Sequence, residues 1–309
     1  MDVKQLRYFI RIVESGNVTR AAEALHIAQP ALSQQLNHLE SELATRLLNR
    51  SALGVTATRS GELLYRHAKE ILRQVDNTRA ALRQESDRPS GRVSVAMPSS
   101  IVRTITAPLL LDLRDRYPGI TLELIEGPSV ELPERVAQGR VEIAIVTIDR
   151  SVRGLALQPL IREELFVLMP PNLRIVRGSI SLRELAKLPI ILPSPPNFIR
   201  TRVDLALSQA GFNYEVVAEA STTSLLIAAV KSGLGVTVLP LSTINEEAAD
   251  SIYAKRITKP PLFRQLAICT TGAHPISLAG EKVRDVIADI VRKLVRAGMW
   301  KGAKDIGDA

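Results

Sequence analysis

Cysteine is almost absent from this chain, since Cys269 is the only one among 309 residues. A single thiol excludes an internal disulfide and any metal site built from several cysteines. Cys269 ends the apolar run Leu266-Ala267-Ile268-Cys269. We therefore expect its side chain to be buried and to pack like a small hydrophobe.

Long hydrophobic runs are also lacking. No apolar stretch approaches the roughly 18 residues that a helix needs to span a bilayer. The first residues, Met-Asp-Val-Lys-Gln, contain no apolar signal region. We therefore expect a cytoplasmic protein with no membrane partner.

The motifs of common enzyme classes are missing as well. The sequence contains no Gly-x-Ser-x-Gly, Walker A or His-Glu-x-x-His motif, and its four histidines lie far apart. The segment Gly233-Leu234-Gly235 lacks the third glycine of a dinucleotide-binding fingerprint. The expectation is a protein that is not an enzyme and that needs no metal or cofactor.

Charge of one sign is in modest excess and is not concentrated at one end. The net charge of +8 favours an acidic partner such as nucleic acid. Residues 1–90 hold 13 Lys and Arg against 10 Asp and Glu, so most of the surplus lies further along the chain. Charge alone therefore does not locate a nucleic-acid site. The length of 309 residues predicts two or three domains.

Three short helices are predicted near the N-terminus. Apolar residues recur at helical spacing over 4–15. A second helix is expected over about 18–25, where the small residues Ala21 and Ala22 let another helix cross closely. Pro30 then suits the first turn of a third helix, where its missing N–H costs nothing.

The third helix has two contrasting faces. Its predicted buried stripe consists of four leucines: Leu32, Leu36, Leu39 and Leu43. The opposite side carries small, uncharged hydrogen-bonding groups, which are Ser41 and the candidate DNA contacts Gln29, Pro30, Ser33, Gln34 and Asn37. Gln and Asn can pair bidentately with adenine, and Ser can donate or accept at a base edge. The alternative is a solvated helix face, but such a face is usually rich in Lys and Glu. We expect this helix to enter a DNA major groove.

Residues 51–58 predict a short hairpin, or wing, with Arg50 and Arg59 at its two ends. These arginines are placed to contact DNA phosphates or a minor groove. A solvated surface position is the alternative for each arginine taken alone.

A long helix is predicted from about Thr58 to Gln84, because this stretch has no proline and a single glycine. A heptad seam, broken only by a threonine, runs along it: Leu64, Ala68, Ile71, Val75, Thr78 and Leu82. The seam favours a helix–helix dimer interface over a helix packed on its own domain. Such a dimer would recognise a two-fold related DNA site. Residues 87–91 are expected to form a hinge.

Beyond Gly91 the pattern alternates between strands and helices, which predicts α/β lobes with a mainly parallel sheet. In the first lobe we expect strands at 93–96, 120–125 and 142–146 and helices at 101–117 and 131–138. In the second we expect strands at 165–169, 189–192, 215–218 and 236–239 and helices at 182–186, 198–210 and 224–232. A strand near 264–270 and a helix over 277–297 would return to the first lobe.

Both lobes contain a strand followed by Pro-Ser and a helix. Ligands of open α/β sheets lie beyond the carboxyl ends of strands, beside helix N-termini. The candidate contacts for a small polar or anionic ligand are therefore Ser99, Ser100, Ser129, Thr147, Ser194, Thr222, Thr223, Arg200 and Arg202. Either arginine is able to clamp a carboxylate, and one of the two is expected at the surface instead. Plain helix capping is the alternative for the hydroxyls.

Together these patterns resemble a LysR-type transcriptional regulator. Its winged helix-turn-helix signature is matched in order and spacing by Ala21-Ala22, Leu25-His26, Gln29-Pro30-Ala31-Leu32-Ser33-Gln34-Gln35, Leu39-Glu40 and Leu43. The chain departs from the signature at Ala44, where a Gly is usual, and at Leu48, where a Phe is usual.

The resemblance implies three parts. An N-terminal all-α winged helix-turn-helix would cover residues 1–58, and a linker and dimerisation helix with a hinge would cover 59–90. A C-terminal α/β, two-lobed, periplasmic-binding-protein-like effector domain would cover 91–309. Lobe I would consist of about 91–163 and 264–297, and lobe II of about 164–263.

The resemblance also implies partners, namely double-stranded DNA, RNA polymerase, a small-molecule effector between the lobes, and further copies in a homodimer or homotetramer. Activation of target promoters is the commoner outcome in the family, and repression is also common. Segments 28–32 and 192–204 look similar to the nitrogen assimilation control subgroup, in which some members work without an effector. A solute-binding protein is the main rival, because the two-lobed domain resembles periplasmic ones.

Overall fold

The computed structural model describes residues 1–51, 54–82, 89–148, 154–173, 178–244, 251–272 and 276–307. The chain divides into two compact units. The first consists of Met1–Asp87 with Gln138–Arg140, and the second of Arg88–Ala137 with Val141–Ala309. None of the helices in these described ranges is long and apolar enough to cross a membrane.

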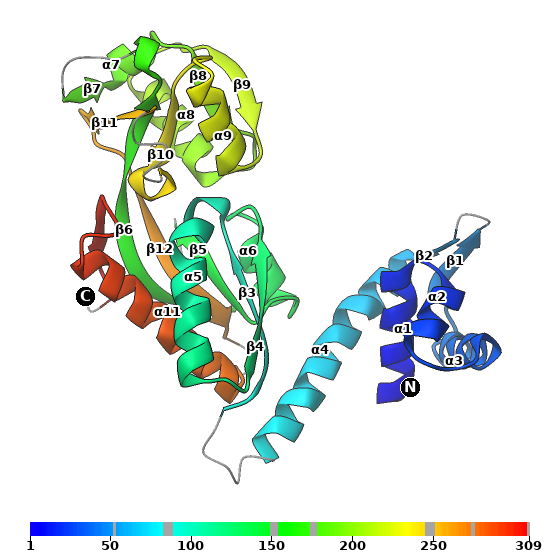
Figure 1. Cartoon of the computed structure of the whole chain (residues 1–309). Helices are drawn as coiled ribbons and strands as arrows, with labels where there is room; N and C mark the ends of the chain where they lie inside the picture. Colours follow the sequence, from blue (N-terminus) through cyan, green and yellow to red (C-terminus); the bar gives the residue numbers. More distant parts are fainter. Residues whose placement is uncertain are drawn as a thin grey trace. The chain divides into compact units, whose positions relative to one another are not determined.

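The first unit contains the predicted helices and wing (Figure 1). They are α1 (Val3–Ser15), α2 (Val18–Ala24), α3 (Gln29–Glu42), the antiparallel strands β1 (Leu48–Ser51) and β2 (Gly54–Ala57), and α4 (Arg59–Leu82). The side chains of Asp2 and Asn17 cap α1 and α2. The wing begins at Leu48 rather than at residue 51, and residues 52 and 53 lie outside the described part. The hydrophobic core of this unit includes the buried residues Phe9, Leu32 and Leu39.

Leu43 does not belong to the buried stripe of α3, so this part of the prediction was wrong. The stripe ends at Leu39, and Leu43 is 37% exposed. The helix stops at Glu42, and the next residues turn away, with Ala44 in the left-handed region at φ 48°. The Gly that is usual at this position would adopt that conformation without strain.

The first half of the predicted dimer seam is occupied within the chain. Ala68 of α4 is fully buried against Leu6 and Ile10 of α1, with Leu64 partly buried beside them. The prediction that Ala68 contacts a second copy was therefore wrong, because α1 already covers it. Further along the helix, Ile71 is 37% exposed, Val75 is half-buried and Thr78 is exposed. The side chain of Leu82 lies outside the described part.

Lobe I of the second unit is built on a mixed sheet. Its elements are β3 (Gly91–Met97), α5 (Ser99–Arg116), β4 (Ile120–Glu126), α6 (Leu132–Ala137), β5 (Ile143–Ile148), β12 (Phe263–Thr271), α11 (Leu278–Arg296) and β13 (Ala303–Asp305). Strands β4, β3 and β5 are parallel, as expected, but β12 runs antiparallel to β5. Helices α5 and α11 contribute to one core, and α6 to another.

Lobe II has its own core and a second set of strands. Its elements are β7 (Ser179–Ser181), α7 (Leu182–Leu185), β8 (Ile190–Pro193), α8 (Phe198–Gln209), β9 (Val216–Ala220), α9 (Thr223–Lys231), β10 (Thr237–Pro240) and β11 (Tyr253–Thr258), with 3-10 turns η1 (Pro171–Leu173) and η2 (Leu241–Thr243). Strands β7, β11 and β13 were not predicted. Two of them are only three residues long, and β11 carries charged residues that interrupt the apolar pattern.

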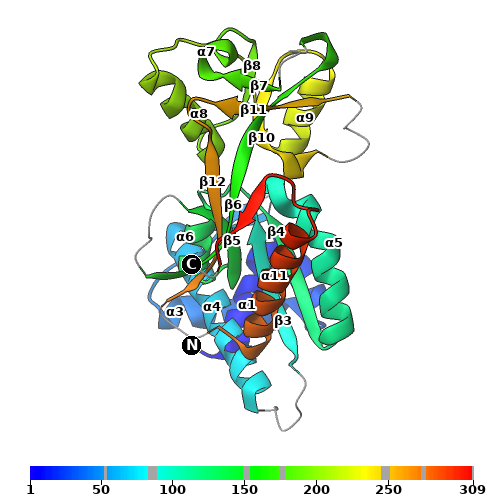
Figure 2. The same cartoon turned by 90° about the vertical axis from the view of Figure 1, so that its left-hand side faces the viewer.

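Two long strands, β6 and β12, connect the lobes. Strand β6 (Leu155–Met169) pairs with β12 in lobe I and continues into lobe II, where it pairs with β10 and β11 (Figure 2). The sequence predicted only its last third, at 165–169, because Arg162-Glu163-Glu164 interrupts the apolar pattern. These charged residues lie where the chain passes from one lobe to the other.

Candidate functional sites

The polar face of α3 is open to solvent, as expected for a surface that contacts DNA. Gln29, Pro30, Gln34 and Asn37 are exposed, and Ser33 is half-buried. The Gln29 side chain donates a hydrogen bond from Nε2 to Ser33 Oγ at 2.9 Å. The N-cap residue of α3, Ala28, makes no side-chain capping hydrogen bond, which leaves the first backbone N–H groups of the helix available to an acceptor. This surface therefore presents donors and acceptors in a partly preorganised arrangement.

The wing is tied to α3 by hydrogen bonds that the sequence did not reveal. Glu40 Oε1 accepts the backbone N–H groups of Leu47 and Leu48 at 2.6 and 3.1 Å, and so anchors the start of β1. Arg50 is exposed, and its NH2 donates to Asn37 Oδ1 at 3.4 Å. The wing arginine and the end of the polar face consequently lie side by side. Arg59 is exposed at the first residue of α4.

A cavity of about 580 Å³ lies between the two lobes of the second unit. The hydroxyl residues predicted from the two lobes all line it: Ser99, Ser100, Ser129, Thr147, Ser194, Thr222 and Thr223. They come from the strand ends and helix N-termini of both lobes, which explains why the sequence located them. We refer to this cavity as the inter-lobe cleft.

Several of these hydroxyls already have partners in the protein. Ser99 Oγ and Thr223 Oγ1 lie 2.9 Å apart, and the Thr223 N–H donates to Ser99 Oγ at 3.3 Å, so the pair joins α5 of lobe I to α9 of lobe II. Ser129 Oγ accepts the Thr147 N–H at 2.8 Å. The cleft is therefore crossed by a direct contact between the lobes.

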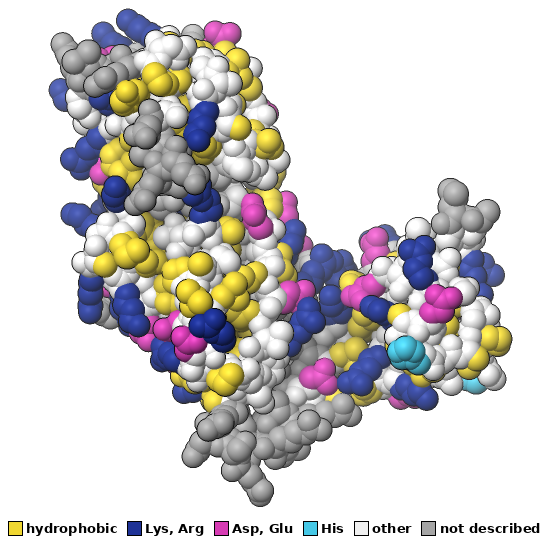
Figure 3. All heavy atoms as spheres, in the orientation of Figure 1, with side chains coloured by type: hydrophobic (Ala, Val, Ile, Leu, Met, Phe, Trp, Pro, Cys, Tyr) yellow, Lys and Arg dark blue, Asp and Glu magenta, His cyan; other side chains and the backbone are white. Residues whose placement is uncertain are grey.

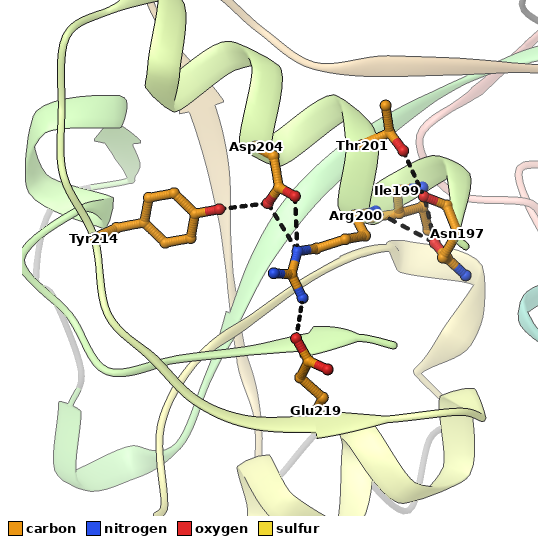
Figure 4. A network of polar contacts seen from close by, with 7 residues as sticks. All are labelled: Asn197, Ile199, Arg200, Thr201, Asp204, Tyr214 and Glu219. Carbon is orange, nitrogen blue, oxygen red and sulfur yellow. Dashed lines mark hydrogen bonds and ion pairs between the residues drawn. The ribbon is translucent and has the colours of Figure 1, made fainter. Parts of the chain in front are cut away.

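Arg200 does not line the cleft, so its prediction as a ligand clamp was wrong. Its Nε donates to both carboxylate oxygens of Asp204, at 2.8 and 2.9 Å, and its NH1 contacts Glu219 (Figure 4). Tyr214 Oη donates to the same Asp204 carboxylate. Partial burial opposes the charge on Arg200, but the hydrogen bonds to Glu219 and Asp204 outweigh it and raise the pKa of Arg200. The Arg200 guanidinium is therefore paired with two carboxylates of lobe II.

Arg202 also lies outside the cleft. Its guanidinium is 6.0 Å from the centre of the Phe198 ring and lines a separate, smaller cavity. Only the N-terminal end of α8, through Asn197, Phe198 and Ile199, reaches the inter-lobe cleft. Both arginines are beyond that end, which explains the error.

The residue that sequence reasoning missed is Arg264. It lines the cleft and is only 2% exposed. Its NH2 lies 2.6 Å from Glu163 Oε2, its Nε donates to the same oxygen at 2.8 Å, and its NH1 donates to Ser100 Oγ at 2.6 Å. The available signal in the sequence was the charged run Arg162-Glu163-Glu164 in an otherwise apolar strand. It did not identify Arg264, because the pairing of Glu163 with Arg264 depends on strand register.

Glu163 is the centre of this buried network. The carboxylate is fully buried and also accepts hydrogen bonds from Trp300 Nε1 at 2.7 Å and Ser242 Oγ at 2.6 Å. The network therefore joins both connecting strands, η2 of lobe II and the segment after α11. Its Arg264 end forms part of the cleft wall.

Comparison with known proteins identifies the chain. The family model for the bacterial regulatory helix-turn-helix protein, lysR family, matches residues 3–62, and the LysR substrate binding domain model matches residues 86–292. This chain belongs to the LysR family of bacterial transcriptional regulators. It is a DNA-binding transcriptional regulator with a substrate-binding domain, as the sequence predicted.

Relatives and solved structures agree with this assignment. The nitrogen assimilation regulatory protein Nac of Escherichia coli (strain K12) is 35% identical over 94% of this chain and 95% of that protein. Nac of Klebsiella aerogenes is 33% identical, over 95% and 96%. A full-length OxyR variant from Pseudomonas aeruginosa is 26% identical with a TM-score of 0.73, covering 94% of this chain and 95% of that one. The LysR regulator therefore shares its fold with the OxyR variant over almost its whole length.

Proposed function

We propose that this LysR-type regulator reads its DNA sites with the polar face of α3. Gln29, Ser33 and Gln34 would contact base edges, with Pro30 against a thymine methyl group and Asn37 beside them. Arg50 and Arg59 would contact phosphates and set the register of the helix in the groove. The exposure of this face and the Gln29–Ser33 hydrogen bond support the proposal.

We further propose that a small polar molecule binds in the inter-lobe cleft and changes how the regulator acts at promoters. The observation that carries this proposal is the cavity of about 580 Å³ whose walls hold hydroxyls from both lobes. A ligand there would compete with the Ser99–Thr223 contact and so alter the arrangement of the lobes.

The charges around the cleft favour a neutral ligand over a carboxylate. The cation in its wall, Arg264, is already paired with Glu163. Glu126 and Glu131 also line the cleft and would repel an anion. Hydroxyl and backbone groups remain to bind a polar, uncharged molecule.

We propose that the regulator works as a homodimer or homotetramer. Ile71, Val75 and Thr78 of α4 remain available for a second copy in the half of the seam that α1 does not cover. Figure 3 shows hydrophobic side chains gathered over α5, where Leu110 and Leu111 are 45% and 52% exposed. Paired subunits on promoter DNA would act by recruiting or blocking RNA polymerase, in the cytoplasm where the DNA is found.

A regulator that needs no effector is the second candidate. The Ser99–Thr223 contact stabilises one arrangement of the lobes without help from a ligand. Similarity to Nac is compatible with this alternative, in which the amount of protein sets the response.

A footprint of the purified regulator on DNA upstream of its own gene distinguishes the candidates. We expect a protected region that shortens or shifts with one member of a panel of uncharged polar metabolites. The same shift should be absent in the variant Thr223→Arg, which would fill the cleft with a charged side chain. Protection indifferent to every metabolite would favour the effector-independent candidate. No protection even at low salt would show that the regulator does not bind upstream of its own gene.

A further inference from the structure

A second cavity, of about 240 Å³, lies in the effector domain beside the strands that connect the lobes. Three arginines contribute to its wall, together with two phenylalanines, an amide and an isoleucine: Arg162, Arg202, Arg264, Phe198, Phe263, Gln265 and Ile148. Among the described residues, Arg264 is the only one of the three arginines that pairs with a carboxylate. We refer to this cavity as the arginine pocket.

Strand register places a further positive charge beside Arg162, which lines this pocket. Arg162 of β6 lies directly opposite Gln265 of β12 and, on its other side, directly opposite Lys304 of β13. Residues directly opposite one another in antiparallel strands point to the same face of the sheet. Arg162 and Lys304 are therefore like charges on neighbouring strands, an unfavourable arrangement that an anion between them would relieve.

The nearby carboxylates do not supply that anion. Glu163 lies on the opposite face and binds Arg264, while Glu164 is paired with Arg256 at 2.6 Å. Asp204 is held by Arg200 and Tyr214, and Asp305 accepts the Gly307 N–H at 3.0 Å. Within the described ranges, no carboxylate lies at ion-pair distance from Arg162 or Arg202.

Aromatic rings position the two guanidinium groups without neutralising them. Arg162 lies over the Phe263 ring at 4.0 Å from its centre, and Arg202 lies 6.0 Å from that of Phe198. The Nε of Arg202 is buried and has no hydrogen-bond partner in the part of the chain that the structure describes. A buried donor without an acceptor is costly, so this atom is a second and independent sign of a missing acceptor.

We propose that the arginine pocket binds a small oxyanion of phosphate chemistry, either free or as the head group of a metabolite. Arg162 and Arg202 would bind its oxygens, since the planar guanidinium fork matches phosphate geometry, and the Gln265 amide would donate a further hydrogen bond. The pocket adjoins the connecting strands and shares Arg264 with the inter-lobe cleft. An anion there would stabilise one position of the lobes independently of DNA or of a ligand in the cleft.

Calorimetric titration of the full-length regulator with inorganic phosphate, in chloride buffer without DNA, tests this site. We expect saturable binding of one phosphate per chain and at least tenfold weaker binding in Arg202→Gln and in Arg162→Gln. The control Arg92→Gln removes an exposed arginine of β3, paired with Glu123 at 3.4 Å, and should leave the affinity unchanged. A parallel titration with a sugar phosphate distinguishes free phosphate from the head group of a metabolite. Tighter binding than that of inorganic phosphate would indicate a metabolite head group.

Three results would overturn the proposal: no saturable heat with either compound, equal loss in Arg92→Gln, or undiminished binding in the Arg162→Gln and Arg202→Gln double variant. Thermal unfolding in chloride checks that each variant folds. If Arg202→Gln does not fold, Arg162→Gln and Gln265→Leu carry the test, because both residues are exposed.

Discussion

The polar face of α3, with the wing beside it, and the inter-lobe cleft are assembled in opposite ways. The first comes from one helix and the wing beside it, so its proposed contacts lie within residues 29–59. The second gathers residues from Pro98 to Arg264, which belong to strand ends and helix starts of two lobes. A helix face is set by its own periodicity, whereas the cleft depends on how distant strands pair.

The difference appears in which predictions failed. Along α3 the exposed face was located correctly, and only Leu43, just past the helix end, was misplaced. At the cleft the local motif, strand then Pro-Ser then helix, located the hydroxyls. The charged groups were predicted wrongly, since Arg200 and Arg202 lie elsewhere and the buried Arg264 lines the cleft instead.

The largest expected effect comes from breaking the buried network that is centred on Glu163. Glu163→Gln would leave Arg264 buried without its counter-charge, and we expect the effector domain to lose about 3–5 kcal/mol of unfolding free energy. The chain has a single tryptophan, Trp300, which donates to Glu163, so its fluorescence during urea unfolding follows this domain. Glu123→Gln, which breaks an exposed pair with Arg92, should cost at most about 1 kcal/mol. Similar losses in the two variants would contradict the importance of burial.

The second effect concerns the proposed recognition of DNA by the polar face of α3. Gln29→Ala or Ser33→Ala should weaken binding to a specific site by about 1–3 kcal/mol and spare binding to random DNA. Because the two side chains share a hydrogen bond at 2.9 Å, the double variant should lose less than the sum of the single losses. Competition binding against random duplexes measures both quantities.

Arg50→Ala is the matched control for base readout. It should weaken binding to all sequences alike and reduce the slope of log affinity against log salt by about one. Equal losses for Ser33→Ala on specific and random DNA would remove Ser33 from the base contacts.

A smaller effect of opposite sign is expected at the end of α3. Ala44 has φ 48°, a conformation that glycine adopts with less strain. Ala44→Gly should therefore stabilise the first unit by roughly 0.5–1 kcal/mol. Hydrogen exchange of α3 amides in the full chain should slow by about two- to fivefold under conditions where exchange follows unfolding of this unit. Faster exchange would show that the left-handed turn costs the alanine nothing.

The smallest effect is expected at Cys269, whose burial raises the pKa of the thiol to about 11. At pH 8 the folded protein should not react with a thiol reagent, while the urea-unfolded chain should react fully. The unfolded thiol ionises at lower pH than the folded one, so this group reduces stability as pH rises above about 9. Rapid labelling of the folded regulator would contradict burial of Cys269.

Helix and strand positions followed from short-range information in the sequence. Apolar spacing and Pro30 predicted the three N-terminal helices, and the hydrophobic runs predicted most strands of both lobes. These signals work because periodicity, capping and turn geometry involve residues only a few positions apart. The family signature lies in such a segment, which is why the sequence alone indicated a LysR-type regulator.

Only the tertiary structure decided which charged groups meet. Glu163 and Arg264 lie 101 positions apart, and antiparallel register brings them together at the passage between the lobes. The same register places Arg162 opposite Lys304, and the packing of α1 decides which half of the α4 seam is already covered. Sequence periodicity shows that a face is apolar or charged. The partner of that face depends on long-range packing, because burial and Coulomb interactions act through space rather than along the chain.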